Sequence, residues 1–303
     1  MPKPLIPNLF HVEQRPNQAQ PAGFTLVELL VVVTVIAALI AILLPTINTA
    51  RTNARHTRAS AHLKHLATGY ATRTSEHRGQ FLYGYTPPTL FGKPVTIQTD
   101  TGHTLGLPVA DRYPWRLAPY VPGIWPILYE HTHQRPPEPL PHEDPASASA
   151  KAYSLSVTPG FGINSCYLGG HHGLWEGFRP ANGSHVPNRG KHVIFNDTEA
   201  NRPATLIVFA ESQARNAPGL APDAGIHFLS PPHARGPKWS VQPNQTFELA
   251  QQAQIVGLPM GRYGPRTATA MLDGHVSSLT PPELADMRRW ANQAQHPTWD
   301  FRP

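Results

Sequence analysis

One segment constrains this chain more than any other: residues 24–44 read FTLVELLVVVTVIAALIAILL, 21 residues with a single charged side chain, Glu28. An α-helix rises about 1.5 Å per residue, so about 20 apolar residues span a hydrocarbon core of roughly 30 Å. A soluble domain would need a very large core to bury such a run. We therefore predict a transmembrane helix over residues 24–44.

A cleaved secretory signal peptide is the main alternative for this segment. Its apolar region usually has about 7–15 residues and ends at a small-residue cleavage site. Here the run is longer and passes into Pro45 without such a site, whereas the small residue Gly23 precedes it. Cleavage after Gly23 would leave the helix on the mature chain, so we interpret the run as a retained anchor.

Glu28 needs its own explanation, because a charged side chain at the bilayer centre costs about 2.5–3.5 kcal/mol on insertion scales. Two interpretations stay open. Glu28 lies near the end of the run and can reach the interface, or it neutralises a positive charge on a neighbouring chain, such as the amino group of a new N-terminus. Burying two opposite charges together costs far less than burying either alone.

Residues 23–31, GFTLVELLV, resemble the type IV prepilin motif that pilins share with the pseudopilins of type II secretion. The resemblance implies that prepilin peptidase cuts after Gly23, that Phe24 is then methylated, and that Glu28 pairs with a neighbour's N-terminus during assembly. It also implies a helix kink at Pro45. It implies a single-pass protein of the bacterial cytoplasmic membrane, with its head on the non-cytoplasmic side and an extracellular or periplasmic filament as the assembled form.

The formal charge of +6 is concentrated behind the apolar run. Between Thr46 and Gly79, six basic residues stand against one acidic residue, whereas the rest of the chain from residue 80 has 17 basic and 16 acidic residues. Nucleic acid is therefore an unlikely partner, and a membrane surface or acidic partners along a helix fit better. Basic residues here would favour a cytoplasmic C-terminus. We give the processing motif more weight, because the peptidase that the resemblance implies acts on the cytoplasmic side.

Residues 45–79 continue the helix with an amphipathic pattern, and Arg51, Arg55 and Arg58 fall on its polar face. Small or apolar residues recur at mostly three- and four-residue steps: Ile47, Ala50, Ala54, Ala61, Leu63, Leu66 and Tyr70. Gly79 and the following prolines end the pattern. We predict one long helix from Phe24 to about Ser75.

Residues 80–303 should form a head domain of short strands and irregular loops, because their apolar runs are short and cut by Pro and Gly. The 35 prolines of the chain exclude an all-helical bundle. We predict an α+β fold in which the long N-terminal helix packs on this β-rich head. The expected head segments are a buried strand at 203–210, a shorter strand at 192–195 and an exposed loop at 136–149.

The end of the head carries the clearest local signal. Two alternating runs flank Asp273-Gly274, which predicts a hairpin over residues 267–279 with positive φ at both turn positions. Thr280 and Glu283 then have capping-box spacing, and a proline follows the cap, so a short helix should cover residues 281–292.

This hairpin extends the resemblance to bacterial prepilin-like proteins whose large head ends in the pattern His, nine residues, Asp-Gly. Asp273-Gly274 fits the end of that pattern. Tyr263 stands where the pattern has His, so the role that the resemblance would assign to that His is open here.

Catalytic motifs are absent from the sequence: it has no Gly-x-Ser-x-Gly elbow, P-loop, His-Glu-x-x-His or paired-Cys pattern. Cys166 is the only cysteine and fits a small core residue better than a nucleophile. Some histidine groups could hold a metal if distant residues converged, although exposed histidines are the simpler interpretation: His62 with His65, His171 with His172, and His131, His133 and His142 with Glu143 and Asp144. We predict no catalytic residue, no bound metal and no cofactor.

These observations favour a non-catalytic structural subunit of a type IV pilus or a type II secretion pseudopilus. Its partners would be prepilin peptidase and other subunits, contacted through the N-terminal helix. One alternative is a membrane-anchored surface protein whose head recognises polysaccharide or DNA. Another is a membrane-tethered, metal-dependent enzyme.

Overall fold

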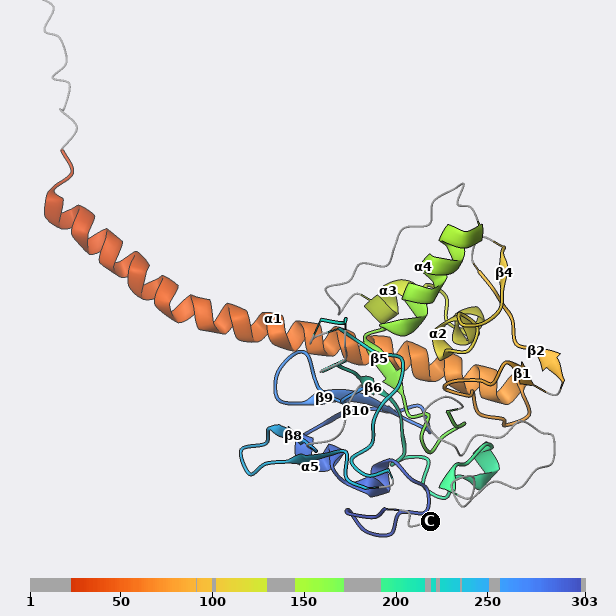
Figure 1. Cartoon of the computed structure of the whole chain (residues 1–303). Helices are drawn as coiled ribbons and strands as arrows, with labels where there is room; N and C mark the ends of the chain where they lie inside the picture. The colour runs from red at the N-terminus through yellow and green to blue at the C-terminus, as the bar shows by residue number, and fades with distance from the viewer. Residues whose placement is uncertain are drawn as a thin grey trace, which may run out of the picture. The chain divides into compact units, whose positions relative to one another are not determined.

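The computed structural model describes residues 23–90, 92–99, 102–129, 145–171, 192–215, 219–221, 224–234, 236–250 and 257–300. It consists of one long N-terminal helix and a head of short helices and small sheets, which confirms the α+β class (Figure 1). By its internal contacts the chain divides into two compact units, Met1–Ala50 and Arg51–Pro303. We describe each unit by itself. Residues 1–22 of the expected leader lie outside the described residues.

Helix α1 covers Leu26–Glu76, in agreement with the helix predicted from Phe24 to about Ser75. In the first unit every side chain of α1 is exposed. An 18-residue window of the helix has a mean hydropathy of 3.0 and no buried residue, so its length and composition suit a membrane span. Pro45 lies inside the helix, and the Thr49 hydroxyl donates to the Pro45 carbonyl at 3.0 Å. The kink expected at Pro45 stays a prediction.

In the second unit α1 buries one face against the head. The buried positions recur at three- and four-residue steps, as an amphipathic helix requires: Ala59, Leu63, Leu66, Tyr70 and Thr74. Leu63, Leu66 and Tyr70 were predicted on this face, but Ala54 and Ala61 are exposed. The face therefore runs through Ala59, because the helix turns about 100° per residue and carries positions 54 and 61 away from the head.

The end of α1 is a Schellman motif, in which two backbone N–H groups after the helix bond back to carbonyls of its last turn. Gly79 N–H donates to the Thr74 carbonyl at 2.9 Å, and Arg78 N–H donates to the Ser75 carbonyl at 3.2 Å. Arg78 has a φ of +57° and Gly79 a φ of +81°. The left-handed position that usually carries Gly is therefore held by an arginine.

Three further helices contribute buried side chains to the same hydrophobic cluster as α1: α2 (Tyr113–Leu117), α3 (Ile124–Tyr129) and α4 (Pro145–Val157). Helix α4 corrects the predicted loop at 136–149, whose residues 145–149 are helical; residues 136–144 lie outside the described residues. Pro at the first helical position is already set at a helical φ, and the alanines that follow favour the helix. The loop was predicted because the segment lacks an apolar period, but these local helix preferences outweigh that lack.

The main sheet has four antiparallel strands in the order β10-β9-β6-β5. The strands are β5 (Phe161–Ile163), β6 (Ile207–Glu211), β9 (Thr267–Met271) and β10 (Val276–Leu279). Every residue of β5, β6 and β9 is buried. Strand β6 corresponds to the strand predicted at 203–210, although residues 203–205 form a turn. The strand predicted at 192–195 is wrong: only Ile194 forms a bridge there, parallel to Leu168.

In the described part of the chain, three two-stranded sheets lie outside the main one, and all are antiparallel. They pair β1 (Thr89–Leu90) with β2 (Lys93–Pro94), β3 (Ile97–Gln98) with β4 (Thr104–Leu105), and β7 (Trp239–Val241) with β8 (Phe247–Leu249).

The predicted hairpin exists as β9 and β10, but its turn differs from the prediction. Met271 N–H donates to the His275 carbonyl and Gly274 N–H to the Met271 carbonyl, both at 2.9 Å. The loop therefore has three residues, and of Asp273 and Gly274 only Gly274 has a positive φ, +87°. A three-residue loop needs a single left-handed position, which Gly supplies.

The helix predicted at 281–292 is shorter and broken. Helix α5 covers Pro281–Leu284, and a 3₁₀ turn, η4, covers Met287–Arg289. The expected capping box is present, with the Thr280 N–H donating to Glu283 at 2.8 Å. Asp286 begins the second turn by accepting from the Arg288 N–H at 3.0 Å. Because an aspartate that bonds its own backbone in this way competes with helix continuation, the helix stops there.

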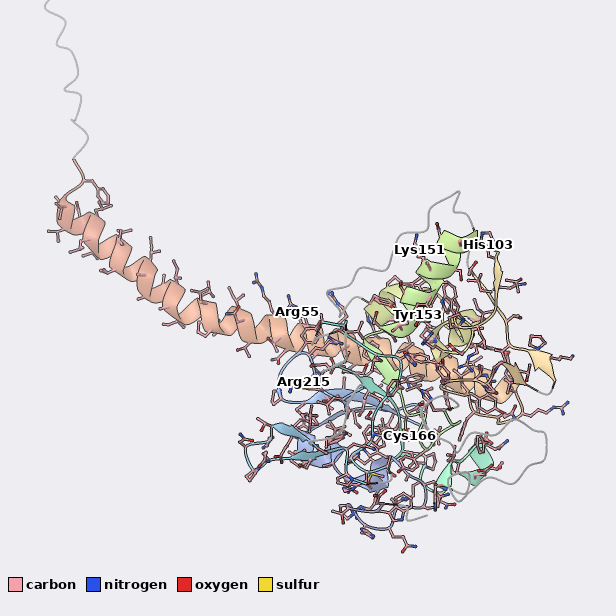
Figure 2. The ribbon with its side chains drawn as sticks, viewed as in Figure 1. Arg55, His103, Lys151, Tyr153, Cys166 and Arg215 are labelled. Atoms are coloured by element: carbon pink, nitrogen blue, oxygen red, sulfur yellow. The ribbon has the colours of Figure 1, made fainter. Side chains whose placement is uncertain are left out.

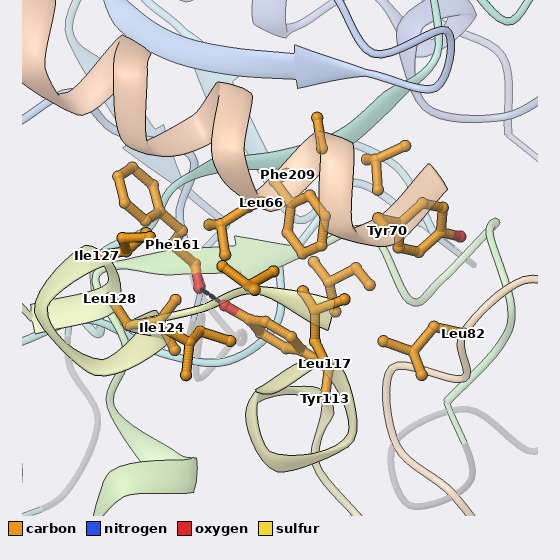
Figure 3. Close-up of a cluster of buried hydrophobic side chains, with 14 of the residues drawn as sticks. Leu66, Tyr70, Leu82, Tyr113, Leu117, Ile124, Ile127, Leu128, Phe161 and Phe209 are labelled. Carbon is orange, nitrogen blue, oxygen red and sulfur yellow. Dashed lines mark hydrogen bonds between the residues drawn. The ribbon is translucent and has the colours of Figure 1, made fainter. Parts of the chain in front are cut away.

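The head is held by two clusters of buried side chains. In the first, Leu66 and Tyr70 of α1 meet Tyr113, Phe161 and Phe209, and the Tyr113 hydroxyl donates to the Phe161 carbonyl at 2.7 Å (Figure 3). Tyr70 meets the Phe209 ring edge-on, with centroids 5.6 Å apart. The second cluster gathers around Trp239 and Trp290. Their indole N–H groups donate to the carbonyls of Ser230 and Leu284, both at 2.8 Å.

Candidate processing and assembly site

The predicted cleavage position lies in an exposed, non-helical stretch. Residues 23–25 precede the first residue of α1, Leu26. A Cβ placed on Gly23 would meet no atom within 4 Å, and Phe24 is 72% exposed. The peptide bond between Gly23 and Phe24, which precedes the helix, is therefore accessible to a peptidase.

Glu28 closes a capping box at the start of α1. Its Oε2 accepts from the Thr25 N–H at 2.9 Å and from the Thr25 hydroxyl at 2.8 Å, while the Glu28 N–H donates to the Thr25 hydroxyl at 3.2 Å. This arrangement satisfies backbone donors that the first turn of a helix leaves open. The sequence analysis missed this function of Glu28, although Thr25 and Glu28 have the Thr-x-x-Glu spacing of such a cap.

In the head, Asp273 organises the hairpin loop. Its Oδ1 accepts from the His275 N–H at 3.0 Å and lies 2.6 Å from the His275 Nδ1. Slight burial alone would raise the pKa of Asp273, but these hydrogen bonds from His275 hold it below its usual value. The neighbouring Gly274 carbonyl accepts from the Lys64 Nζ at 2.8 Å, which joins the loop to α1.

Tyr263, ten residues before Asp273, also contacts α1. The guanidinium carbon of Arg55 lies 5.8 Å from the centre of the Tyr263 ring, within the range of a cation–π contact. Ser278 Oγ lies 3.1 Å from the His56 Nε2. Together with the Lys64 contact, these interactions fasten the C-terminal hairpin region along residues 55–64 of α1. The sequence could not have revealed them, because they join positions about 200 residues apart.

The structure describes only some members of the histidine groups that the sequence left open as metal sites. Among the residues that the structure describes, no group of three or more His, Cys, Asp or Glu side chains is arranged to hold a metal ion. His62 and His65 lie on α1. His172 and residues 131–144 lie outside the described parts of the chain. Cys166 is buried, and burial raises the pKa of its thiol well above the usual value.

A polar cluster is buried beside the main sheet. The Tyr85 and His171 rings stack with centroids 4.7 Å apart and planes 5° apart, and Arg112 lies over the Tyr85 ring at 5.5 Å. Asp111 contacts Arg112 at 3.3 Å. His227 lies nearby, and burial first, then the charges of Arg112 and His171, hold its pKa well below the usual value. Sequence reasoning missed the cluster, whose members come from four separate segments of the chain.

Comparison with protein families gives one match: a model described as a prokaryotic N-terminal methylation motif covers residues 20–44. A search of curated proteins found no match. A search of solved structures found none either. The matched stretch contains Gly23, Phe24 and Glu28 and most of the exposed apolar part of α1. The N-terminal segment is thus pilin-like: the motif points to a substrate of prepilin peptidase, a pilin or pseudopilin, and fits an inner-membrane anchor with a periplasmic head.

Proposed function

We propose that this chain is a non-catalytic structural subunit of a type IV pilus or a type II secretion pseudopilus. The observation that carries the proposal is the methylation motif at the start of an exposed apolar helix long enough to cross a membrane. Prepilin peptidase would cut after Gly23, and Phe24 would become the methylated N-terminus. The mature helix would then hold the subunit in the membrane until assembly.

Glu28 would serve twice in this scheme. It caps its own helix through Thr25, with both of its bonds made by Oε2. Its second oxygen would accept from the new amino group of a neighbouring subunit. Pairing the two opposite charges reduces the cost of keeping each in an apolar filament core. Pro45 would give the helix the local freedom to bend during assembly.

The domain organisation that we propose follows from the same scheme. Residues 1–23 form the leader, 24–44 the membrane helix, 45–79 its amphipathic continuation and 80–303 the head. We also propose that the head belongs to the prepilin-like group whose C-terminal pattern ends in Asp273-Gly274. Tyr263 would replace the motif histidine by contacting α1 through Arg55.

Mass spectrometry of the protein extracted from membranes of its native host tests the proposal most directly. We expect the mature chain to begin at Phe24 with one additional methyl group, and Gly23→Leu to accumulate as full-length precursor. Glu28→Leu should be inserted and cleaved but should be missing from sheared filaments. Thr34→Leu, which changes a polar side chain of the same helix, is the matched control and should assemble. A native N-terminus at Met1 or beyond Leu44 would overturn the proposal.

The alternative of a surface-binding head makes a different prediction. Retention of polysaccharide or DNA would then depend on the head and would persist in Glu28→Leu, where assembly is blocked. A structural subunit would lose its function together with assembly.

A further inference from the structure

One side of α1 carries a row of cations, which we call the basic stripe: Arg51, Arg55 and Arg58. All three are exposed and follow the spacing i, i+4, i+7, so they share one face of the helix. No acidic residue occurs in the sequence between Thr46 and Ser75. Within the described part of the chain, no carboxylate forms an ion pair with Arg51 or Arg55. The guanidinium of Arg55 lies over the Tyr263 ring (Figure 2).

A groove of about 520 Å³ lies at the other end of this part of α1, and we call it the distal groove. Its walls are the last turns of α1 and the 3₁₀ turn η3 (Asp197–Glu199). The residues that matter here are Thr74, Ser75, Gly79, Asp197 and Thr198. The Asn196 amide donates to the Arg78 carbonyl at 3.2 Å and the Asp197 N–H to the Gly79 carbonyl at 3.0 Å, so the two walls are fixed to each other.

The distal groove offers acceptors that the rest of the described chain does not use. Asp197 is exposed, and no basic side chain of the described residues pairs with it. The Thr74 side chain is only 6% exposed, yet its hydroxyl has no hydrogen-bond partner among the described residues. By contrast, the hydroxyls of Thr68 and Thr72 donate to carbonyls four residues earlier, at 2.8 and 3.1 Å. The exposed Asp197 carboxylate at the edge of this groove suits a guanidinium group.

The stripe and the groove face opposite ways. With 3.6 residues per turn, the stripe and the positions of α1 that line the groove point about 160° apart. Arg55 and Ser75 are 20 residues apart in one helix, which is about 30 Å along the axis. A second copy shifted by about that distance therefore presents its stripe to the groove of the first. Contacts between two different surfaces of identical chains propagate as open helical filaments when they do not close into a ring.

We propose that the distal groove of one copy binds the basic stripe of a second copy, with Asp197 accepting from Arg55. This inference rests on the proposed function, because it names the surfaces by which the assembled subunits contact each other outside the membrane helix. The contact sets the axial stagger between copies. The groove of the first copy thus supplies an acidic partner for the second copy's basic stripe, and that stripe supplies a basic partner for Asp197.

Charge reversal in the full-length chain, expressed in its native host, tests this contact. The readout is the amount of subunit in sheared, sedimented filaments. Arg55→Glu and Asp197→Lys should each lower it by at least about tenfold, because juxtaposed like charges oppose docking. The double variant should recover to within about threefold of the unchanged chain, since the pair is restored with its charges exchanged. Lys93→Glu and Glu248→Lys, two exposed positions on β2 and β8, are the matched controls and should assemble normally.

Two further variants, Asp197→Asn and Glu28→Leu, distinguish a failure of the groove contact from a failure of the proposed function. Asp197→Asn should cause a smaller loss than Asp197→Lys, and both Asp197 variants should keep the melting temperature of the unchanged protein in detergent. Normal assembly of both reversals, with Glu28→Leu failing, overturns the groove contact and leaves the proposed function standing. A loss in Arg55→Glu alone assigns the stripe to another partner, such as anionic lipid headgroups, and overturns the contact. A loss in both reversals that the double variant does not rescue also overturns the groove contact. Normal assembly of all three variants overturns the proposed function as well.

Discussion

Glu28 shows how one side chain can satisfy a structural and an assembly requirement at once. In the single chain its carboxylate caps the helix that contains it, through Thr25. Cleavage after Gly23 would remove neither member of that cap, so the mature helix would begin with the same first turn. The local function explains why a carboxylate is tolerated in the precursor, and the proposed pairing explains what it does in the filament.

Asp273 gives a prediction at the same scale. Asp273→Ala removes the acceptor for the His275 N–H and ring, so we expect the free energy of unfolding of the head to fall by about 0.5–1.5 kcal/mol. Asp273→Asn keeps an acceptor at the same place and should lose less. Thermal or urea unfolding of the full chain in detergent measures both. Equal stability of Asp273→Ala and the unchanged chain would contradict the role of this side chain in the loop.

At the scale of elements, α1 ends in a way that can be improved. Arg78 holds a left-handed position with a φ of +57°, which costs an L-residue roughly 1 kcal/mol more than glycine. Arg78→Gly should therefore raise the free energy of unfolding by about 0.5–1 kcal/mol. The bonds from Arg78 N–H to Ser75 and from the Asn196 amide to the Arg78 carbonyl use only the backbone at residue 78, so both survive the change.

The matched control for this prediction is Thr72→Gly, an exposed helical site about one turn before the end of the same helix. Glycine there should lower the free energy of unfolding by about 0.3–0.5 kcal/mol, the difference between the helix propensities of threonine and glycine. Opposite signs for the two glycines, read from the same chemical unfolding experiment, would support the helix end described here. A loss of stability in Arg78→Gly equal to that in Thr72→Gly would refute it.

Elements with strong local signals could be predicted from the sequence. The long helix, the hairpin and the capping box before α5 all rest on spacing within a few residues. The errors occurred where a neighbour in space or a single side chain overrode the pattern. Asp286 begins a separate 3₁₀ turn where the predicted helix would continue, and within residues 192–195 only Ile194 forms a bridge, to Leu168. The processing residues were visible in the sequence, but the contacts of Tyr263 and the distal groove depend on folding.

For the whole molecule, buried histidines predict a loss of stability in acid. Burial lowers the pKa of His227 well below its usual value, and it also lowers those of His56, His77 and His233. The unfolded chain then binds more protons than the folded one below about pH 6.5, where free histidine titrates. The stabilisation is complete above that pH and is lost as the pH falls below it, by up to about 1.4 kcal/mol per unit for His227.

His227→Gln tests this expectation, because glutamine cannot take up the proton. Its free energy of unfolding should change less than that of the unchanged chain between pH 7.5 and 5.5, whereas His65→Gln, at an exposed site of α1, should behave like the unchanged chain. The contribution of Glu211 to the free energy of unfolding changes with pH in the opposite direction. Burial raises the pKa of Glu211, so its protonation in acid removes a buried charge and stabilises the folded chain. Glu211 is present in all three proteins and cancels in the comparison. Identical pH profiles for His227→Gln and the unchanged chain would contradict the expectation.

Cys166 lies inside the head, and it is the only cysteine of the chain (Figure 2). Its buried thiol stays protonated at neutral pH, because burial raises its pKa, and a protonated thiol reacts slowly with alkylating reagents. A cysteine introduced on the outside, for example at Arg58 or Thr198, would therefore be the one site that takes a maleimide dye. The native fold thus already provides the background for fluorescence or distance measurements on single subunits, with no need to remove a natural residue first.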